Sequence, residues 1–552
     1  MVSGMGKKDN KGGFIVQAGI LAATGIICRI IGLLYRSPLA SVIGNEGNGY
    51  YSAAYNIYTI ILLVSSYSIP SAISKVIAER LALKQYKNAH RIFKCALIYV
   101  IAVGGVASLF TYFCAGWLVR HESIVVLQIF APTIFFSGLL GVLRGYFQAH
   151  GTMLQTSVSQ IIEQILNAVV SIWAAYMFMQ MVASKDETTQ AVYGAAGSAL
   201  GTGVGVVAAL LFMLLMYLLN KSYIKKRVAR DRRKEVLSYH HIFQIIFLMV
   251  TPVILSTCIY NSSTVVNQKL YELIMENVHG VAGNVVATYY GVFGGKTSVI
   301  INIPVALASA MAAAMVPMIS GSYATGDEEE TCSKIQQGIR TTMLISIPCA
   351  AAMLILPKEI VAFLFPQNEL IEVAAGTLRV LSVSVIFYAL STLTNGVLQG
   401  IGKVNIPMIN AAIALVMQTV VLVALLFLTN ANLYALAIAM IVYSFAMCLL
   451  NQIAIHKYLG YGMNLKKIFG MPILASMLMG GVAWLVYHGL YMVIPVASYS
   501  AKNRFCLSLT IVAAVFVYFA LVIKFHILNE EEMMALPKGR LLVRIAKKLR
   551  LL

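Results

Sequence analysis

Charged side chains are scarce in this chain, and acidic ones are the scarcest. Of 552 residues, Asp, Glu, Lys and Arg together make up 11%, with 21 acidic against 41 basic residues. Soluble domains carry about 25% charged residues, so the composition excludes the roughly three or four soluble domains that this length would suggest. Hydrophobic residues make up 59%, more than a soluble fold can bury. Lipid is therefore the expected solvent.

Several kinds of site are also missing. The eight cysteines lack metal-binding spacing, so we expect neither disulfides nor zinc. Only four Asp occur, and none lies in an apolar run, which argues against a metal-dependent glycosyltransferase. Gly294–Thr297 resembles the end of a phosphate-binding loop, but Tyr290 stands where that motif needs glycine, so no nucleotide is expected. Met1–Lys8 shows no cleavable signal pattern, and Asp327–Glu330 is expected to be a solvated loop.

The apolar runs are long enough to span a membrane as helices, which takes about 20 residues each. They are continuous and do not alternate as spanning strands would. The run Val404–His456 contains no charged residue and is divided by a turn at Thr429–Asn432. The sequence predicts fourteen spans: 14–35, 49–69, 95–119, 123–143, 157–182, 191–219, 242–266, 284–317, 341–357, 373–399, 405–428, 433–455, 469–494 and 504–523.

The basic residues predict the orientation. With the N-terminus in the cytoplasm, the predicted cytoplasmic segments hold 31 of the 41 basic residues and the external segments hold 7. Because Lys and Arg favour cytoplasmic loops, both termini are predicted to be cytoplasmic in a bacterial cell membrane. The net charge of +20 is then mainly an orientation signal, and no nucleic acid partner is expected.

An internal repeat predicts the architecture. Gly145-x-x-Gln148-x-x-Gly151 recurs as Gly396-x-x-Gln399-x-x-Gly402, each at the predicted cytoplasmic end of the fourth helix in a set of six. Two sets that both start from the cytoplasm are parallel repeats. We therefore predict an all-α polytopic protein with these parts: an N-terminal tail 1–12, an N-lobe 13–220, a basic linker 221–240, a C-lobe 241–456, helices 13 and 14 within 457–525, and a basic amphipathic tail 526–552.

Ionisable groups inside spans cost roughly 2.5–3.5 kcal/mol each at the helix centre, so they point to function. We expect a cationic substrate site between the lobes, formed by Arg29, Arg36, Lys296 and Arg379. The two arginines are two helical turns apart, which puts them on one stripe of a straight helix, and Arg binds phosphate oxygens bidentately. Alternatively, these cations pair internally, for example with Glu163, the only carboxylate in the predicted spans. Further cavity or rim residues are Lys75, Arg144, Gln148, Glu163, Asn261 and Gln399.

Three segments carry a family resemblance. Cys28–Gly44 resembles the first-helix motif of bacterial lipid-linked oligosaccharide flippases, Ser68–Lys75 resembles the motif that closes their second helix, and Arg144–Gln148 with Ser159–Gln164 resembles their fourth and fifth helices. The chain is thus similar to the polysaccharide biosynthesis proteins of the stage V sporulation protein B type. These are relatives of MurJ-type lipid II flippases in the multidrug/oligosaccharidyl-lipid/polysaccharide exporter superfamily.

The resemblance implies a transporter and not an enzyme. It implies two six-helix lobes around a cationic cavity, a groove for a polyprenyl tail at helices 13 and 14, and alternating access. The cargo would be an undecaprenyl-pyrophosphate glycan, with lipid II as the first candidate. Arg29 and Arg36 match the family's paired first-helix arginines at a spacing one residue wider, and Lys75 and Lys296 are nearest to its other basic positions.

The resemblance also bears on cofactors and partners, and no resident cofactor or metal is expected. In helices 7 and 11, where some relatives bind sodium through carboxylates, this chain has Asn261, Asn410 and Gln418. That difference favours the membrane potential over a monovalent cation as the driving force. Besides the polyprenyl-pyrophosphate glycolipid and membrane lipids, no partner is expected, and the protein is predicted to be a monomer.

Two other classes compete with the flippase. A cation-coupled multidrug exporter of the same superfamily would have about twelve helices and intramembrane carboxylates, whereas this chain has more predicted spans and a cationic interior. A membrane scaffold or glycan-assembly enzyme would need catalytic carboxylates on long external loops, and the predicted loops are short. A flippase for a different lipid-linked polysaccharide precursor stays open as an alternative cargo.

Overall fold

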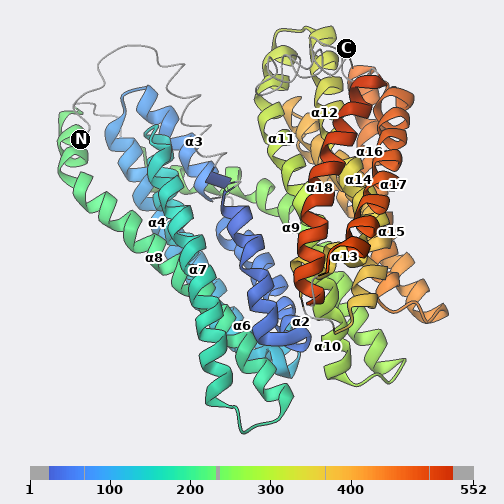
Figure 1. The fold of residues 1–552 in the computed structure, drawn as a ribbon. Coiled ribbons are helices and arrows are strands. Elements are labelled where there is room, and N and C mark those ends of the chain that lie inside the picture. Colours follow the sequence, from blue (N-terminus) through green and yellow to red (C-terminus); the bar gives the residue numbers. More distant parts are fainter. Residues whose placement is uncertain are drawn as a thin grey trace. The chain divides into compact units, whose positions relative to one another are not determined.

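The computed structural model describes residues 24–25, 27–67, 69–231, 237–366, 369–495, 498–525 and 527. Within those ranges every regular element is helical, as Figure 1 shows, which confirms the predicted all-α class. The chain divides into two compact units. The first runs to Glu272 and includes Val281–Gly291, and the second comprises Leu273–Gly280 and the chain from Val292 onward. The predicted tails lie outside the described residues, apart from Ile527.

The first unit packs its helices through small residues. A Cβ atom on Gly201 of α8 would lie 2.2 Å from Ser171 Oγ of α7, and one on Gly197 would lie 2.4 Å from the carbonyl oxygen of Ala174. Such close approach is typical of membrane helices, where van der Waals packing drives association. The elements of this part of the chain are α2 Arg36–Leu62, η1 Leu63–Tyr67, α3 Ile69–Ala82, α4 Tyr86–Phe113, α5 Ala115–Leu118, η2 His121–Ser123, α6 Ile124–Ala149, α7 Met153–Met181, α8 Glu187–Arg230, α9 Tyr239–Asn277 and α10 Gly283–Val292.

The second unit is organised around α14, which packs against α11, α12 and α16. The last two helices, α17 and α18, pack against each other, and α17 also packs on α12. The elements from Phe293 onward are η3 Phe293–Thr297, α11 Ser298–Ala324, α12 Glu328–Ile355, α13 Pro357–Leu364, α14 Ile371–Gly400, α15 Asn405–Leu428, α16 Leu433–Leu459, η4 Lys466–Gly470, α17 Met471–Val493 and α18 Tyr499–Lys524.

Eleven helices among the described residues are long and apolar enough to cross a membrane, or twelve if the bent pair Ile27–Leu34 and Arg36–Ser65 forms one span. The eleven coincide one for one with predicted spans 3 to 6 and 8 to 14. The first two predicted spans, 14–35 and 49–69, overlap the bent pair, and residues 14–23 of the first lie outside the described residues. Within α2, Gly44 (φ 68°) joins two helices. The seventh lies inside α9, which is continuous from Tyr239 to Asn277. The count of fourteen and the orientation stay predictions.

The repeated motif has the same backbone geometry in both units. At the end of α6 Gly151 has φ 74°, and at the end of α14 Gly402 has φ 79°. The Gly151 amide donates to the carbonyl of Gln148 at 2.9 Å, and the Gly402 amide donates to that of Gln399 at 3.0 Å. Glycine tolerates this left-handed conformation without strain. The two motifs are therefore equivalent helix C-caps, each followed at once by the next long helix.

Both units also contain a π-helical turn. η1 joins α2 to α3 in the first unit, and η3 joins α10 to α11, with Lys296 in its last turn. Such turns are rare and occur frequently at functional sites. By its contacts α9 belongs mainly to the first unit, and the predicted lobe boundary at 221–240 stays a prediction.

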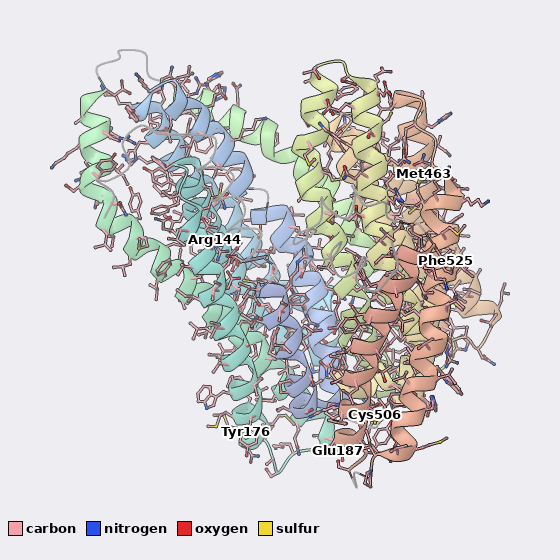
Figure 2. All side chains as sticks on the ribbon, turned by 45° about the horizontal axis from the view of Figure 1, so that its top comes forward. Arg144, Tyr176, Glu187, Met463, Cys506 and Phe525 are labelled. Atoms are coloured by element: carbon pink, nitrogen blue, oxygen red, sulfur yellow. The ribbon has the colours of Figure 1, made fainter. Side chains whose placement is uncertain are left out.

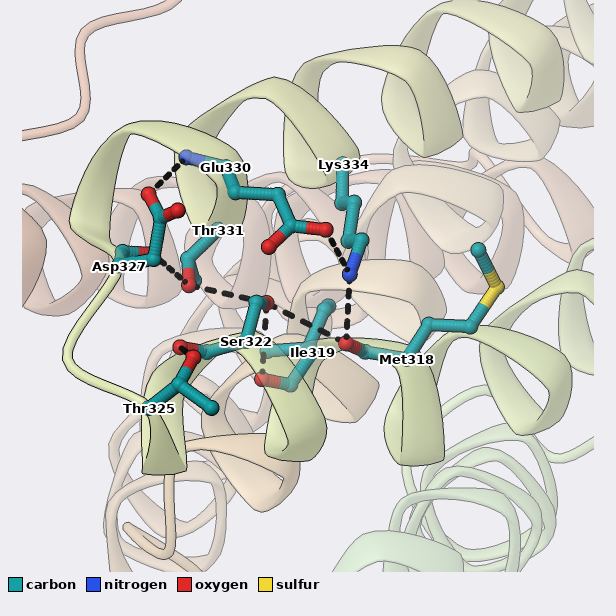
Figure 3. Close-up of polar contacts among 8 residues, drawn as sticks. All are labelled: Met318, Ile319, Ser322, Thr325, Asp327, Glu330, Thr331 and Lys334. Carbon is teal, nitrogen blue, oxygen red and sulfur yellow. Dashed lines mark hydrogen bonds and ion pairs between the residues drawn. The ribbon is translucent and has the colours of Figure 1, made fainter.

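The acidic segment predicted as a solvated loop is the start of a helix. Asp327 caps α12 by accepting a 2.8 Å hydrogen bond from the Glu330 amide, as Figure 3 shows. Thr331 Oγ1 donates to Ser322 Oγ of α11 at 3.0 Å, and Lys334 pairs with Glu330 at 2.8 Å. Acidic residues in a first helical turn complement the helix dipole. The three consecutive glutamates thus begin α12 and remain exposed.

Candidate functional site

The first-unit charges form a pair between α6 and α7. Arg144 Nη2 lies 2.8 Å from Glu163 Oε2, and Arg144 Nε donates to Ser159 Oγ at 2.9 Å. Figure 2 locates Arg144 among the helices of the first unit. Its guanidinium is therefore already occupied, and the internal pairing that the sequence left open applies to Arg144 and Glu163. Gln148, one turn further along α6, is half-buried.

The second unit has an uncharged network at the equivalent place. The repeat offset relates Arg144 to Asn395 and Ser159 to Asn410. Asn410 Nδ2 donates to Asn451 Oδ1 at 2.9 Å, and Asn451 Nδ2 donates to Asn395 Oδ1 at 2.8 Å. Both units thus use polar side chains at these positions to bridge neighbouring helices. The comparison favours a structural role for Arg144.

Arg36 begins α2 beside tyrosines and not beside acids. It is half-buried and lies close to Tyr35, Tyr51 and Tyr55, the last two of which stack at 5.6 Å between ring centroids. No carboxylate lies within ion-pair distance of Arg36 in the described part of the chain. A guanidinium surrounded by hydroxyl groups retains its capacity to bind an anion.

Arg29 and Arg36 do not share a straight helix. The axis bends by 44° between Ile27–Leu34 and the helix that starts at Arg36. Arg29 is exposed whereas Arg36 is half-buried. Tyr35 itself keeps right-handed helical angles, and helical hydrogen bonds join it to Ile31 and Leu39, so the single stripe inferred from the spacing stays a prediction.

Lys296 is the most deeply buried cation of the predicted site. Only 1% of its surface is exposed, and its Nζ has no hydrogen-bond partner among the described residues. It occupies η3, where the π-helical geometry is accompanied by a hydrogen bond from Thr297 Oγ1 to the Phe293 carbonyl. Burying an unpaired ammonium is costly. An anionic group could offset that cost only in a conformation that uncovers Nζ, because the side chain is almost fully enclosed here.

The other predicted site residues are more open. Arg379 and Gln399 are exposed on α14, and Lys75 is exposed on α3. Asn261 is half-buried on α9. The structure thus gives Lys296 and Arg379 very different surroundings within one unit. Arg29 and Arg36 belong to the first unit.

Sequence reasoning missed a buried acidic network. Asn56 Nδ2 of α2 donates to Gln268 Oε1 at 2.7 Å and to Tyr290 Oη at 3.1 Å, and Gln268 Nε2 donates to Glu272 Oε1 at 2.8 Å. Gln268 and Glu272 are both buried. Glu163 stays the only carboxylate within the predicted spans, and Glu272 lies beyond the predicted limit at residue 266 because α9 continues to Asn277. The spacing of Gln268 and Glu272, four residues apart on one helix face, was the available signal.

The described residues contain no group of three or more His, Cys, Asp or Glu side chains that could hold a metal ion. Of the predicted site cations, Arg36 lies among tyrosines and Lys296 is buried, while Arg144 is paired with Glu163. Arg36 and Lys296 can each attract an anionic group, and neither is placed for acid–base or nucleophilic catalysis of a defined reaction.

Two family models and several known proteins match the chain. A family model described as polysaccharide biosynthesis protein matches residues 16–322, which is more than half of the chain, and a model described as MatE matches residues 252–425. The lipid II flippase MurJ of Bacillus subtilis (strain 168) is 23% identical over 86% of this chain and 88% of its own length. Stage V sporulation protein B of the same organism is 22% identical over 96% and 99%, respectively.

Solved structures share the fold. A lipid II flippase MurJ in an inward closed conformation superposes with a TM-score of 0.63 at 16% identity, covering 92% of this chain and 98% of that one. An inward-facing multidrug resistance MATE family transporter of the MOP superfamily gives 0.60 at 16% identity, covering 81% and 98%. The apolar helices and these relatives make the chain a multi-pass protein of the bacterial cytoplasmic membrane.

Proposed function

Because the chain belongs to the polysaccharide biosynthesis protein family, we propose that it is a flippase for a lipid-linked glycan. The cargo would carry a polyprenyl pyrophosphate and move from the inner to the outer leaflet. We propose lipid II, the peptidoglycan precursor, as the first cargo to test. The similarity to the lipid II flippase MurJ extends over 86% of this chain and 88% of MurJ. Another lipid-linked polysaccharide precursor is the alternative cargo.

One observation carries the proposal: cations stand within the helices without carboxylate partners. Among the described residues, Lys296 is buried with no hydrogen-bond partner, and Arg36 lies beside tyrosines with no carboxylate within ion-pair distance. A pyrophosphate offers the charge that these groups lack, and Arg and Lys are the usual phosphate ligands. A cationic cargo would be repelled by the same groups.

The cycle would be alternating access, with the head group bound at the cations during transfer. The polyprenyl tail would stay in lipid along α17 and α18, whose surfaces carry many exposed apolar residues. The membrane potential would drive the anionic head group outward, because each charge gains about 2.3 kcal/mol per 100 mV. A monovalent cation is the alternative driving force, and we propose that the chain works as a monomer.

The test uses cells depleted of their own lipid II flippases. We expect the chain to restore externalised lipid II, measured by labelling on the cell surface. Lys296→Ala and Arg36→Ala are expected to lower the rate about tenfold each, as for loss of one charge-assisted phosphate contact. Lys334→Ala is the control, because Lys334 is paired with Glu330 at the α11–α12 turn. If the wild-type chain restores no lipid II, this cargo is wrong. If all three variants behave alike, the cationic site is wrong.

Multidrug export is the second candidate, supported by the MatE match over residues 252–425. The buried Glu272 network in that segment resembles what a cation-coupled exporter needs: a carboxylate that can take up a proton or cation. If the chain exports drugs, its expression should raise resistance to cationic dyes, and Glu272→Gln should abolish that resistance. Unchanged susceptibility in expressing cells would exclude this candidate.

A further inference from the structure

A hollow lined by aromatic and basic side chains opens where α4, α6 and α8 of the first unit converge. Its enclosed volume is about 30 Å³, and the space between its side chains reaches about 320 Å³ when the part open to solvent is included. The polar lining comes from Arg227, His90 and His150, and the aromatic lining from Tyr86, Tyr146 and Tyr223. Leu81, Ala89, Ile224 and Val228 complete the wall. None of these residues belongs to the predicted substrate site.

Arg227 is held in place in this hollow without being neutralised. Its guanidinium lies 5.3 Å from the ring centroid of Tyr86 and 5.1 Å from that of Tyr223. No carboxylate is within ion-pair distance of it among the described residues. Stacking on aromatic faces fixes the plane of the guanidinium and leaves its N–H groups free to bind an oxyanion.

The walls of the hollow are also fixed. The Lys87 amide donates to Asp231 Oδ2 at 3.0 Å, and Arg91 Nη1 donates to the Leu237 carbonyl at 2.7 Å. These bonds tie the chain beyond α8 to the start of α4. His150 Nδ1 is 2.9 Å from the Tyr146 carbonyl, which makes Nδ1 the donor and turns Nε2 away from that contact. The nearby acid, Asp231, is therefore already engaged.

The hollow lies at the level where the helices leave the apolar layer. α8 has 44 residues, which corresponds to about 66 Å of helix, twice the roughly 30 Å of hydrocarbon. Between Glu187 and Lys221 it carries no charge, and from Lys221 onward it is strongly basic. α4 begins at Tyr86 and α6 ends at Ala149 beside this basic segment. Tyrosine and basic residues are typical of the lipid headgroup region.

We propose that this hollow binds the phosphate of an anionic phospholipid in the leaflet at the basic ends of α4, α6 and α8. Arg227 would hold the phosphate oxygens, the tyrosines would flank the glycerol, and the apolar wall would receive the upper acyl chain. The site is separate from the cations proposed for the cargo. It would anchor the first unit to its leaflet while the lobes move, and it does not depend on which cargo is carried.

The test titrates delipidated, detergent-purified protein with phosphatidylglycerol and counts bound lipids by native mass spectrometry. We expect Arg227→Ala to weaken the tightest phosphatidylglycerol site about tenfold, as for loss of a bidentate arginine–phosphate contact. Arg227→Lys should weaken it less, because it keeps the charge and loses the planar fork. Lys226→Ala, next to Arg227 on α8 but outside the hollow, should leave this site unchanged.

Three results would overturn the proposal. If Lys226→Ala weakened phosphatidylglycerol binding as much as Arg227→Ala, the lipid would be attracted by the basic segment as a whole and not by a specific site. Equal affinity for phosphatidylcholine would remove the requirement for an anionic headgroup. Displacement of the lipid by millimolar inorganic phosphate would assign the hollow to free phosphate. The thermal midpoint of Arg227→Lys, expected to match that of the wild type, shows whether a loss of binding reflects a loss of folding.

Discussion

Neutralising the ion pair between α6 and α7 separates a structural role of Arg144 from a role in binding cargo. The Arg144–Glu163 distance is 2.8 Å, and the side chains are 15% and 23% exposed. At an effective dielectric constant of about 20 the gross attraction is about 6 kcal/mol, much of which is offset by desolvation. Removing one partner of a fully buried pair costs about 3–5 kcal/mol. For this partly exposed pair we expect about 2–3 kcal/mol from either Arg144→Gln or Glu163→Gln.

The double variant is the informative one. With both charges removed, no uncompensated ion is left, and the expected total loss is about 1–2 kcal/mol, less than the sum of the singles. Unfolding in SDS of the detergent-purified protein measures the free energies, and externalised lipid II in flippase-depleted cells measures transport. If the pair is structural, the double variant regains both stability and transport relative to Arg144→Gln. Additive destabilisation with no recovery of transport would show that Arg144 contacts the cargo, and the reasoning would fail.

Three further predictions rest on single positions. Gly151→Ala and Gly402→Ala should each destabilise the fold by about 1–2 kcal/mol in SDS unfolding, because the positive φ at these positions disfavours a side chain. Steric overlap is not the cause, since no atom lies within 4 Å of an added Cβ. The control Gly105→Ala, equally unobstructed but in the middle of a helix, should not destabilise the fold. Lys296→Met should raise the unfolding free energy by about 1–3 kcal/mol, because it removes a buried polar group that has no hydrogen-bond partner, and it should lower transport about tenfold. A loss of both stability and transport would contradict this. Burial, together with the Arg227 guanidinium, lowers the pKa of His150. The unfolded state therefore binds the proton first, and the stability of the fold should decrease as the pH drops below about 6.5. His150→Gln should reduce this loss of stability, measured as the difference in thermal midpoint between pH 7 and pH 5.

Hydrophobic runs predicted most of the helices because spanning helices must be apolar along their length. The predicted ends of the helices are too early where polar residues continue a helix. Main-chain hydrogen bonds within a helix do not depend on apolar side chains, so α9 extends past its apolar run to Asn277. Gln268 and Glu272 fell outside the predicted span for that reason. Gln268 accepts a hydrogen bond from Asn56 of α2, a contact between distant segments that no local pattern encodes.

Two backbone irregularities could not be predicted from the sequence, for a different reason. The 44° bend beside Tyr35 and the π-helical turn around Lys296 have no simple residue signature, since such turns depend on how neighbouring helices pack. The stripe inferred for Arg29 and Arg36 assumed a straight axis, and it stays a prediction. The glycines of the repeat were readable because a left-handed C-cap selects glycine directly.

The two halves of the repeat share backbone features but differ in charge, and this difference argues for where the cargo binds. Gly151 and Gly402 end equivalent helices in the same conformation, so the fold constrains both copies alike. The position occupied by Arg144, which is neutralised by Glu163, is occupied by the neutral Asn395 in the other copy. Lys296, in contrast, is buried without a partner among the described residues. Polar contacts that join neighbouring helices need no net charge, whereas a buried cation without a hydrogen-bond partner lowers the stability of a fold. A cation kept under that cost is best explained by a ligand that neutralises it during transport.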